Sequence, residues 1–368
     1  MSLAPAPGSR RIYVDHTHVR GHVTGIERVA LDLFAPEGLH PHAVEAVRSP
    51  SLLAMIAAQQ VGLPARGLID RAALVMFPGF PPGPLALALG PRCLTYVHDT
   101  FLLDRARDLS WKSRLYMAPS FALALRFGRR FFVNSETTGA ALRRHCAPEA
   151  LVALLRPSVR DVFNLGATAG PAAFAPGCPL RILAIGTIEP RKDYAAALAI
   201  VAALNAAGTP AELHLVGRVG WGAHSFLQAP PPFLTLHGYV DDAGLGALVA
   251  SCHLLLSTSK AEGLGLPLLE VQHGGLPVVA PAGPVFSEVL GESALLVAPE
   301  DAEAAAGAIR AWIARGGLAA ASAAARSNVA RWNAAAAADL ARFRAFLSVG
   351  PAAYALPGSV VPPIGGTM

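Results

Sequence analysis

The stretch Ser257 to Ala280 reads S-T-S-K-A-E-G-L-G-L-P-L-L-E-V-Q-H-G-G-L-P-V-V-A. The apolar runs at 254–258 and 276–280 are typical of buried parallel strands, so the residues between them are expected to cross over as a helix. Pro267 suits the first turn of that helix, where its missing N–H costs nothing. The pattern therefore predicts a strand–helix–strand unit and favours an α/β fold with parallel sheets.

The loop before this helix suits an anionic ligand. Gly263 and Gly265 leave the backbone bare, so a ligand could approach it closely. Free amides and the dipole at a helix start attract anions, so we expect a phosphate-bearing ligand. Glu262 in the loop, and Glu270 about one turn into the helix, are placed to accept hydrogen bonds from the hydroxyls of a sugar and a ribose. The alternative is an ordinary amphipathic helix with solvated acids.

The same stretch resembles the E-x7-E signature of retaining glycosyltransferases of family 4, usually E-G-F-G-L-P-x-L-E-A. In this chain Leu264 replaces the aromatic residue and Val271 replaces the alanine. The resemblance implies that Glu262 lies by the transferred sugar and that Glu270 accepts a hydrogen bond from the nucleotide ribose. The donor-binding residues implied in the loop are Gly263, Leu264, Gly265 and Leu266.

Two further loops resemble a mannosyltransferase-like subgroup of that family. They are E-P-R-K, after the expected strand at 181–186, and V-G-x-x-G-W, after the strand at 211–216. The resemblance implies that Arg191 and Lys192 grip the donor diphosphate, and that Gly186 and Gly217 bind the donor. The chemistry agrees, because a departing nucleoside diphosphate gains negative charge that two fixed cations stabilise. The alternative is a pair of ordinary surface cations.

Three more segments are similar to elements of the family. Gly25 in T-G-I-E-R-V would approach the donor diphosphate, although a simple turn glycine is the other interpretation. His98 in T-Y-V-H-D-T follows an expected strand, at the edge where open α/β sheets bind ligands. The resemblance places it near the donor sugar and acceptor, in a catalytic role, and a buried structural histidine is the alternative. Tyr239 and Val240 would lie against the nucleotide base.

Composition favours a compact protein of two domains. The chain has 368 residues, 53% hydrophobic and 15% charged. Its four cysteines have no metal-binding spacing, which indicates neither a zinc site nor a disulfide framework and fits a reducing cytosol. No apolar run is expected to reach the roughly 18 residues needed to span a bilayer. We therefore expect a cytoplasmic protein, soluble or peripheral on the inner face of the cytoplasmic membrane.

The segment Arg105 to Arg130 carries seven basic residues against one acid, with aromatic residues interleaved. Such a helix suits anionic lipid headgroups or a pyrophosphate-linked acceptor, and a solvated helix face is the alternative. Nucleic acid is not expected as a partner, because no nucleic-acid-binding motif accompanies the charge.

The resemblance implies a GT-B architecture, in which two Rossmann-like domains with parallel sheets face each other across a cleft. The expected parts are an N-terminal acceptor-binding domain at 1–163, a linker at 164–179 and a nucleotide-sugar-binding domain at 180–332. A C-terminal helix at 333–350 would pack back on the first domain, and a flexible tail would follow at 351–368.

The expected activity is transfer of a hexose, with mannose favoured, from a nucleoside-diphosphate sugar to a saccharide or lipid-linked saccharide. Retention and a role in bacterial surface-polysaccharide biosynthesis (lipopolysaccharide or exopolysaccharide) are implied by the family, and GDP-mannose is the favoured donor. No D-x-D motif occurs. We expect neither a metal nor another cofactor, because Arg191 and Lys192 could replace the metal.

Two other functions stay open. One is a GT-B enzyme of another type, such as an epimerase or phosphorylase, and the other is a non-catalytic nucleotide-sugar-binding subunit. Such a subunit would be expected to lose Glu262, Arg191 or Lys192, yet all three are present. A phosphorylase would need a pyridoxal-phosphate lysine context, which we do not find among the three lysines.

Overall fold

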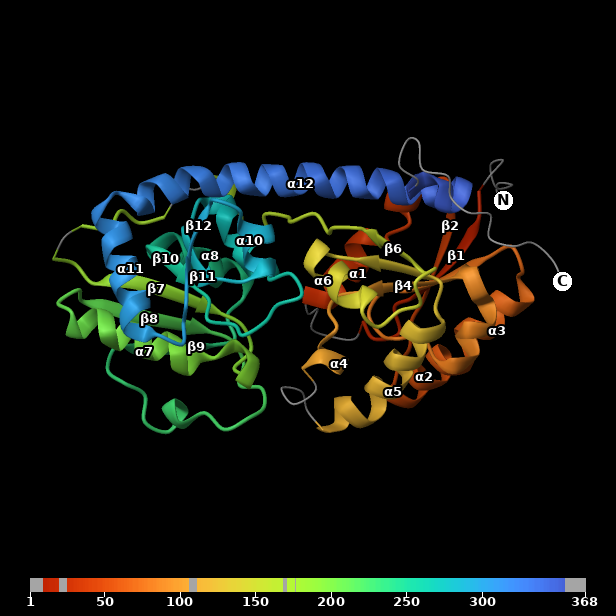
Figure 1. Ribbon diagram of the computed structural model, residues 1–368, viewed down its shortest axis with the longest axis horizontal. Helices are drawn as coiled ribbons and strands as arrows, with labels where there is room; N and C mark the ends of the chain where they lie inside the picture. The colour runs from red at the N-terminus through yellow and green to blue at the C-terminus, as the bar shows by residue number, and fades with distance from the viewer. Residues whose placement is uncertain (1–8, 20–24, 106–110, 168–170, 176, 355–368) are drawn as a thin grey trace. The chain divides into compact units, whose positions relative to one another are not determined.

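The computed structural model describes residues 9–19, 25–105, 111–167, 171–175 and 177–354. It divides into two compact units: unit 1 comprises Met1–Pro157 with Ala335–Met368, and unit 2 comprises Ser158–Ala334. Each unit contains one sheet of six parallel strands, with helices packed against it (Figure 1).

The sheet of unit 1 has the strand order β2-β1-β3-β4-β5-β6. Its strands are β1 Arg11–Asp15, β2 Ala43–Val47, β3 Leu74–Phe77, β4 Cys93–Val97, β5 Arg130–Val133 and β6 Leu151–Leu154. Its helices are α1 Gly25–Leu33, α2 Leu52–Ala57, α3 Leu63–Ile69, α4 Phe101–Asp104, α5 Trp111–Phe127 and α6 Glu136–Arg143. The strands β3 and β4 are buried along their whole length, as parallel strands covered on both faces should be.

The sheet of unit 2 has the order β12-β11-β10-β7-β8-β9. Its strands are β7 Leu180–Ile185, β8 Ala211–Val216, β9 Leu234–Gly238, β10 Leu254–Leu256, β11 Val278–Pro281 and β12 Ala294–Val297. Its helices are α7 Tyr194–Ala206, α8 Asp242–Ser251, α9 Leu266–Glu270, α10 Pro284–Leu290 and α11 Ala302–Ala314. The order reverses between β7 and β10, and open α/β sheets bind ligands at the carboxyl ends of strands at such a point.

Alternate residues of the unit 2 strands enter two separate apolar cores. Ile182 of β7 packs with α7 and α11 on one face of the sheet. Its neighbour Leu183 packs with α8, α9 and α10 on the other face. Because side chains along a strand alternate between the two faces, β7 contributes apolar side chains to both cores. This packing gives the loops after β7 and β10 a rigid base.

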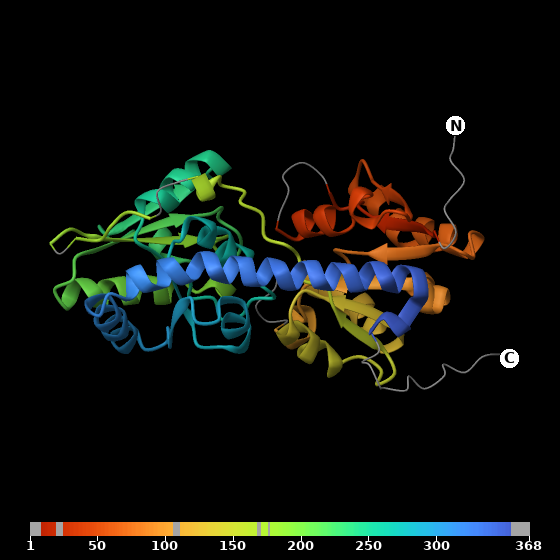
Figure 2. The ribbon, with the colours of Figure 1, turned by 90° about the horizontal axis from the view of Figure 1, so that it is seen from above.

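A single long helix, α12 Gly317–Val349, contributes to both units and is unbroken in Figures 1 and 2. In unit 2, Trp332 is buried in the core beside α9 and α10. In unit 1, the Phe343 ring packs edge-on against Phe132, with ring centroids 4.7 Å apart. The buried Asp339 accepts a hydrogen bond from the Arg156 guanidinium at 2.8 Å. Residues 335–349, close to the expected C-terminal helix, therefore belong to unit 1.

The stretch expected to be a linker, 164–179, belongs to unit 2, and the units divide after Pro157. Leu165 is buried in the core of unit 2, and Phe163 packs in the same core. Apolar side chains thus anchor the start of this Gly/Ala/Pro-rich stretch. Most of the expected flexible tail, 355–368, lies outside the described residues, and a 3-10 turn occupies Gly350–Tyr354.

Unit 1 also contains an apolar helical stretch that the sequence reasoning did not anticipate. Leu52–Ile69 runs through α2, a π-helical turn at Ala58–Gly62 and α3. By length and composition alone it is the one described helix that could cross a membrane, and 28% of it is buried. The expectation that no stretch reaches this length is therefore wrong by that criterion.

Candidate active site

The loop after β7 carries the two expected cations. Gly186 ends the strand with a φ of 142°, and a Cβ at this position would lie 3.1 Å from both the Lys192 Cε and the Tyr194 hydroxyl. A 3-10 turn spans Pro190–Lys192, and Asp193 follows in the left-handed conformation with a φ of 50°. The Tyr194 hydroxyl donates to the Gly186 carbonyl at 2.9 Å. Burial raises the pKa of Tyr194, so this hydroxyl stays protonated.

Backbone and hydroxyl contacts join the β7 loop to the loop after β10. The Thr258 hydroxyl lies 3.0 Å from the Lys192 carbonyl and 2.8 Å from the Asp193 carbonyl. The Lys260 N–H donates to the Arg191 carbonyl at 2.8 Å, and the Arg191 guanidinium donates to the Ala261 carbonyl at 2.7 Å. These contacts join the two loops to each other without the help of any carboxylate.

Glu262 is held by both cations. Its Oε1 accepts from the Lys192 Nζ at 2.6 Å, and its Oε2 accepts from the Arg191 Nη1 at 2.9 Å. Burial disfavours the ionised carboxylate, but Lys192 and Arg191 outweigh burial and lower its pKa to about 2. Glu262 is therefore a carboxylate at neutral pH.

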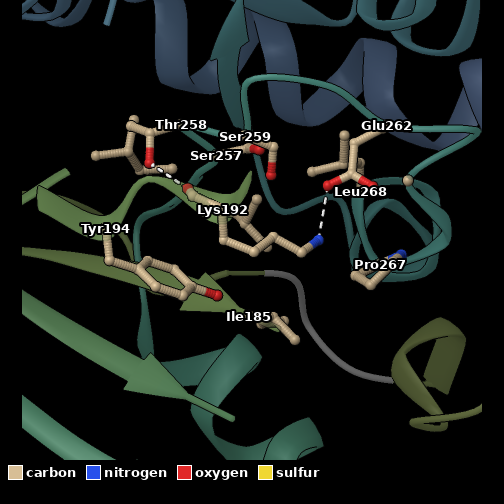
Figure 3. A pocket seen from close by; sticks show the side chains of 12 residues that line it. Ile185, Lys192, Tyr194, Ser257, Thr258, Ser259, Glu262, Pro267 and Leu268 are labelled. Carbon is tan, nitrogen blue, oxygen red and sulfur yellow. Dashed lines mark hydrogen bonds and ion pairs between the residues drawn. The ribbon is translucent and has the colours of Figure 1, made fainter. Parts of the chain in front are cut away.

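A pocket opens where these loops meet, and Figure 3 shows the Lys192 side chain extending across it toward Glu262. Hydroxyls and apolar groups share its wall. The lining residues are Ile185, Lys192, Tyr194, Leu255, Leu256, Ser257, Thr258, Ser259, Glu262, Gly265, Pro267 and Leu268. The pocket lies at the carboxyl ends of β7 and β10, where the strand order reverses. The Lys192 ammonium, the Glu262 carboxylate and the hydroxyls of this wall suit a ligand with both a phosphate and a sugar.

The start of α9 forms one side of this pocket. Gly265 caps the helix with a φ of 80°, and Pro267 lies in its first turn. The Leu264 side chain is buried in the core, while Leu266 is partly buried against it. Glu270 is the last residue of α9 and is 7% exposed. The helix is only five residues long before a 3-10 turn follows at Val271–Gly274.

Two glycines bring the ends of β7 and β8 close together. A Cβ at Gly217 would lie 1.9 Å from the Gly186 carbonyl oxygen, so a larger residue would push the β7 loop away. At the end of β9, Tyr239 is 63% exposed and the Arg218 guanidinium lies over its ring, 4.6 Å from the centroid. Val240 packs partly buried against the core. These residues surround the ends of the strands on the β8 side of the pocket.

The remaining two candidates, Gly25 and His98, lie in unit 1. Gly25 begins α1 and is exposed, and residues 20–24 before it lie outside the described residues. His98 follows β4, and its Nε2 lies 2.7 Å from the Pro78 carbonyl. Burial lowers the pKa of His98 to about 4, so the ring is neutral at pH 7.

Sequence reasoning missed several residues of the site. Glu189 binds the Arg191 Nη2 at 2.6 Å, and Asp193 pairs with Lys260 at 3.3 Å. Glu189 stands at the head of the E-P-R-K element, so its place in that element could have indicated a role. Thr258 and Ser259 lie just before Glu262 in the sequence, but only the fold shows that Thr258 contacts the loop after β7.

Residues 179–315 match a family model described as glycosyl transferases group 1. WbdA, a serotype-specific mannosyltransferase of Escherichia coli, is 32% identical over 164 residues, or 43% of this chain and 20% of WbdA. The O-antigen chain mannosyltransferase B of Escherichia coli is 33% identical over 133 residues, or 33% of this chain and 34% of that protein. The matched segment thus spans about a fifth of the first relative and a third of the second.

The fold is also similar to HepE of Anabaena, whose structure contains UDP-glucose. The TM-score is 0.63 at 18% identity, and the match covers 90% of this chain and 99% of HepE. This is the GT-B fold. The fold class predicted from the sequence is confirmed. Unit 2 is the part of this GT-B chain that carries the group 1 match and the paired Arg191, Lys192 and Glu262.

Proposed function

We propose that this GT-B protein transfers a hexose from a nucleoside-diphosphate sugar to a saccharide or lipid-linked saccharide, with retention of configuration. One observation carries the proposal: Glu262 is bound by Lys192 and Arg191 in a pocket at the switch point of the unit 2 sheet. The group 1 match over 179–315 includes all three residues and supports this interpretation.

Lys192 and Glu262 of the pocket, with residues of the neighbouring loops, suit the two halves of such a donor. The Arg191 guanidinium and the Lys192 ammonium would hold the diphosphate and stabilise the charge that it gains as the bond to the sugar breaks. Glu262 would accept hydrogen bonds from the transferred sugar, and Glu270, one turn further on, from the ribose. Tyr239 at the end of β9 would contact the base. His98 and Gly25, in unit 1, stay predictions from the resemblance to the family.

Mannose is the favoured sugar and GDP-mannose the favoured donor. Both curated relatives described above are named as mannosyltransferases, and the E-P-R-K element resembles a mannosyltransferase-like subgroup. The name of the second relative refers to O-antigen, which supports a role in the synthesis of a bacterial surface polysaccharide. The acceptor would then be a growing saccharide, free or linked to a lipid.

A peripheral contact with the membrane is part of the proposal. Leu115 and Phe127 of α5 are 73% and 54% exposed, and Arg126 lies beside the Phe127 ring. Apolar side chains with adjacent arginines suit an anionic lipid surface. Two cations of the expected basic segment contact other residues of unit 1: Arg129 pairs with Glu149, and Arg130 lies over the Phe346 ring. Residues 106–110 lie outside the described residues.

The test is donor binding and transfer with the purified protein. Calorimetry with GDP-mannose, UDP-glucose and the free nucleotides should show binding of a nucleoside-diphosphate sugar, with GDP-mannose bound most tightly. Incubation with a mannose-containing saccharide acceptor should release GDP and extend the saccharide. Absence of binding to any nucleotide sugar would contradict the proposed function.

A further inference from the structure

Ion pairs make the proposed diphosphate site electrically neutral. The two joined loops contain three cations, Arg191, Lys192 and Lys260, and three carboxylates bound to them. These acids are Glu189, Asp193 and Glu262. A diphosphate that entered this arrangement unchanged would bring negative charge to a site with no net positive charge. The side chains of Arg191, Lys192, Glu189 and Glu262 are largely shielded from water, so an excess of negative charge among them would be costly.

The three carboxylates differ in what they hold. Asp193 pairs with Lys260, which is not one of the two cations assigned to the diphosphate. Glu189 binds only the Nη2 of Arg191, and its side chain is 6% exposed. Glu262 alone uses both of its oxygens, one on each of the two cations, and it lines the pocket. It therefore has the position and the charge that the diphosphate would need.

The loops do not depend on Glu262 for their attachment. Thr258 binds the Lys192 and Asp193 carbonyls, Lys260 donates its N–H to Arg191, and Arg191 donates to Ala261. Glu189 still holds the Arg191 guanidinium from its other nitrogen. The Glu262 side chain can therefore turn away while the two loops stay joined and the Arg191 guanidinium keeps its other partners.

We propose that Glu262 is an exchangeable counter-ion: the donor diphosphate displaces it from Arg191 and Lys192, and it returns to them to help expel the nucleoside diphosphate after transfer. This inference rests on the proposed function and adds to it an account of product release. With the sugar present, the displaced carboxylate accepts hydrogen bonds from sugar hydroxyls. Once the sugar has left, it has no such partner and competes with the product for the cations.

The proposal predicts that one substitution in the site strengthens nucleotide binding instead of weakening it. Glu262→Gln should bind GDP or UDP more tightly than the parent, on the order of tenfold, because the neutral amide competes weakly for the two cations. In the parent, the nucleotide sugar should bind more tightly than the nucleotide alone, and this preference should shrink in Glu262→Gln. Turnover of the variant should fall, with stronger inhibition by the nucleoside diphosphate.

Matched variants separate this exchange from a general effect of charge. Glu189→Gln removes the same charge from Arg191 but should bind GDP or UDP no more tightly than the parent, because Glu189 orients the guanidinium. Glu262→Asp keeps the charge on a shorter side chain, which cannot reach both cations, and should give intermediate tightening. Thermal unfolding of each variant verifies that it is folded.

Calorimetry with GDP and UDP on the full chain gives outcomes that either support or overturn the inference. Tighter binding in Glu262→Gln but not in Glu189→Gln supports it. Unchanged or weaker binding in Glu262→Gln, or equal tightening in both variants, overturns it while leaving the glycosyltransferase assignment standing. If the parent and all variants bind neither nucleotides nor nucleotide sugars, the proposed function fails, and this inference fails with it.

Discussion

The Lys192 ammonium and the Glu262 carboxylate lie 2.6 Å apart, although 70 residues separate them in the chain. Lys192 belongs to the loop after β7, and Glu262 belongs to the loop after β10. The strands β7 and β10 are direct neighbours in the sheet, with Leu254 paired to Ile182. The parallel register therefore brings a cation and an acid from distant motifs to one pocket, where glycosyl transfer would use both.

This pair predicts a specific dependence of stability on pH. The folded pKa of Glu262 is about 2, against an ordinary value of 4.5, so its ionised form stabilises the fold above about pH 4.5. That contribution, at most about 3 kcal/mol, should be lost as the pH falls from about 4.5 toward 2. Chemical denaturation at several pH values should show this loss for the parent. Its persistence at full size in Glu262→Gln would exclude Glu262 as the source.

Replacing Glu270 should separate binding from chemistry. A hydrogen bond to the ribose is made equally in the ground state and the transition state, so Glu270→Ala should raise the donor KM and leave kcat nearly unchanged. The expected loss in donor affinity is about 10- to 150-fold, the worth of a hydrogen bond to a buried carboxylate. Steady-state kinetics with varied donor measure both constants. A fall in kcat with KM unchanged would argue against a ribose contact.

Turnover should not require a divalent metal. Under the proposed function, Arg191 and Lys192 would supply positive charge where the diphosphate departs, which is the role that a metal would otherwise have. We expect the same rate with and without EDTA, and no gain on adding Mg²⁺ or Mn²⁺. Complete loss of activity in EDTA, with recovery on adding either metal, would contradict the assignment of that role to the two side chains.

The exposed side of α5 should bind anionic membranes. Leu115 and Phe127 would enter the interface while adjacent arginines meet the headgroups, so binding should weaken as salt rises. Co-sedimentation with vesicles containing phosphatidylglycerol should recover more protein than vesicles of phosphatidylcholine. The double substitution of Leu115 and Phe127 by serine should reduce this recovery. Equal recovery with both lipids at low salt would favour the solvated helix face.

Much of the framework could be predicted from local patterns. The expected strand at 211–216 appears as β8 at those positions, and the apolar runs at 254–258 and 276–280 contain β10 and most of β11. The glycine loop and Pro267 likewise indicated where α9 begins. The alternation of strands with helices predicted parallel sheets, whereas the GT-B fold was implied by the resemblance to family 4.

Contacts made by individual side chains could not be predicted in the same way. The bond between Glu189 and Arg191 depends on how the 3-10 turn directs two side chains. The contact of Thr258 with the Lys192 carbonyl depends on the pairing of β7 with β10. The stretch 164–179 looked like a linker because of its composition, and only packing shows that Leu165 is buried. Helix α9 is short because a 3-10 turn begins at Val271 and ends in the left-handed Gly275.

The most direct test of glycosyl transfer at this site compares turnover with donor binding for Arg191→Ala and Lys192→Ala. In the proposed reaction their contact with the diphosphate would strengthen as the sugar departs, so we predict that each variant loses more in kcat than in affinity for GDP-mannose. Calorimetry and a transfer assay on the same preparations provide both numbers. If both variants match the parent in turnover and in binding, the site is not where this protein performs its chemistry.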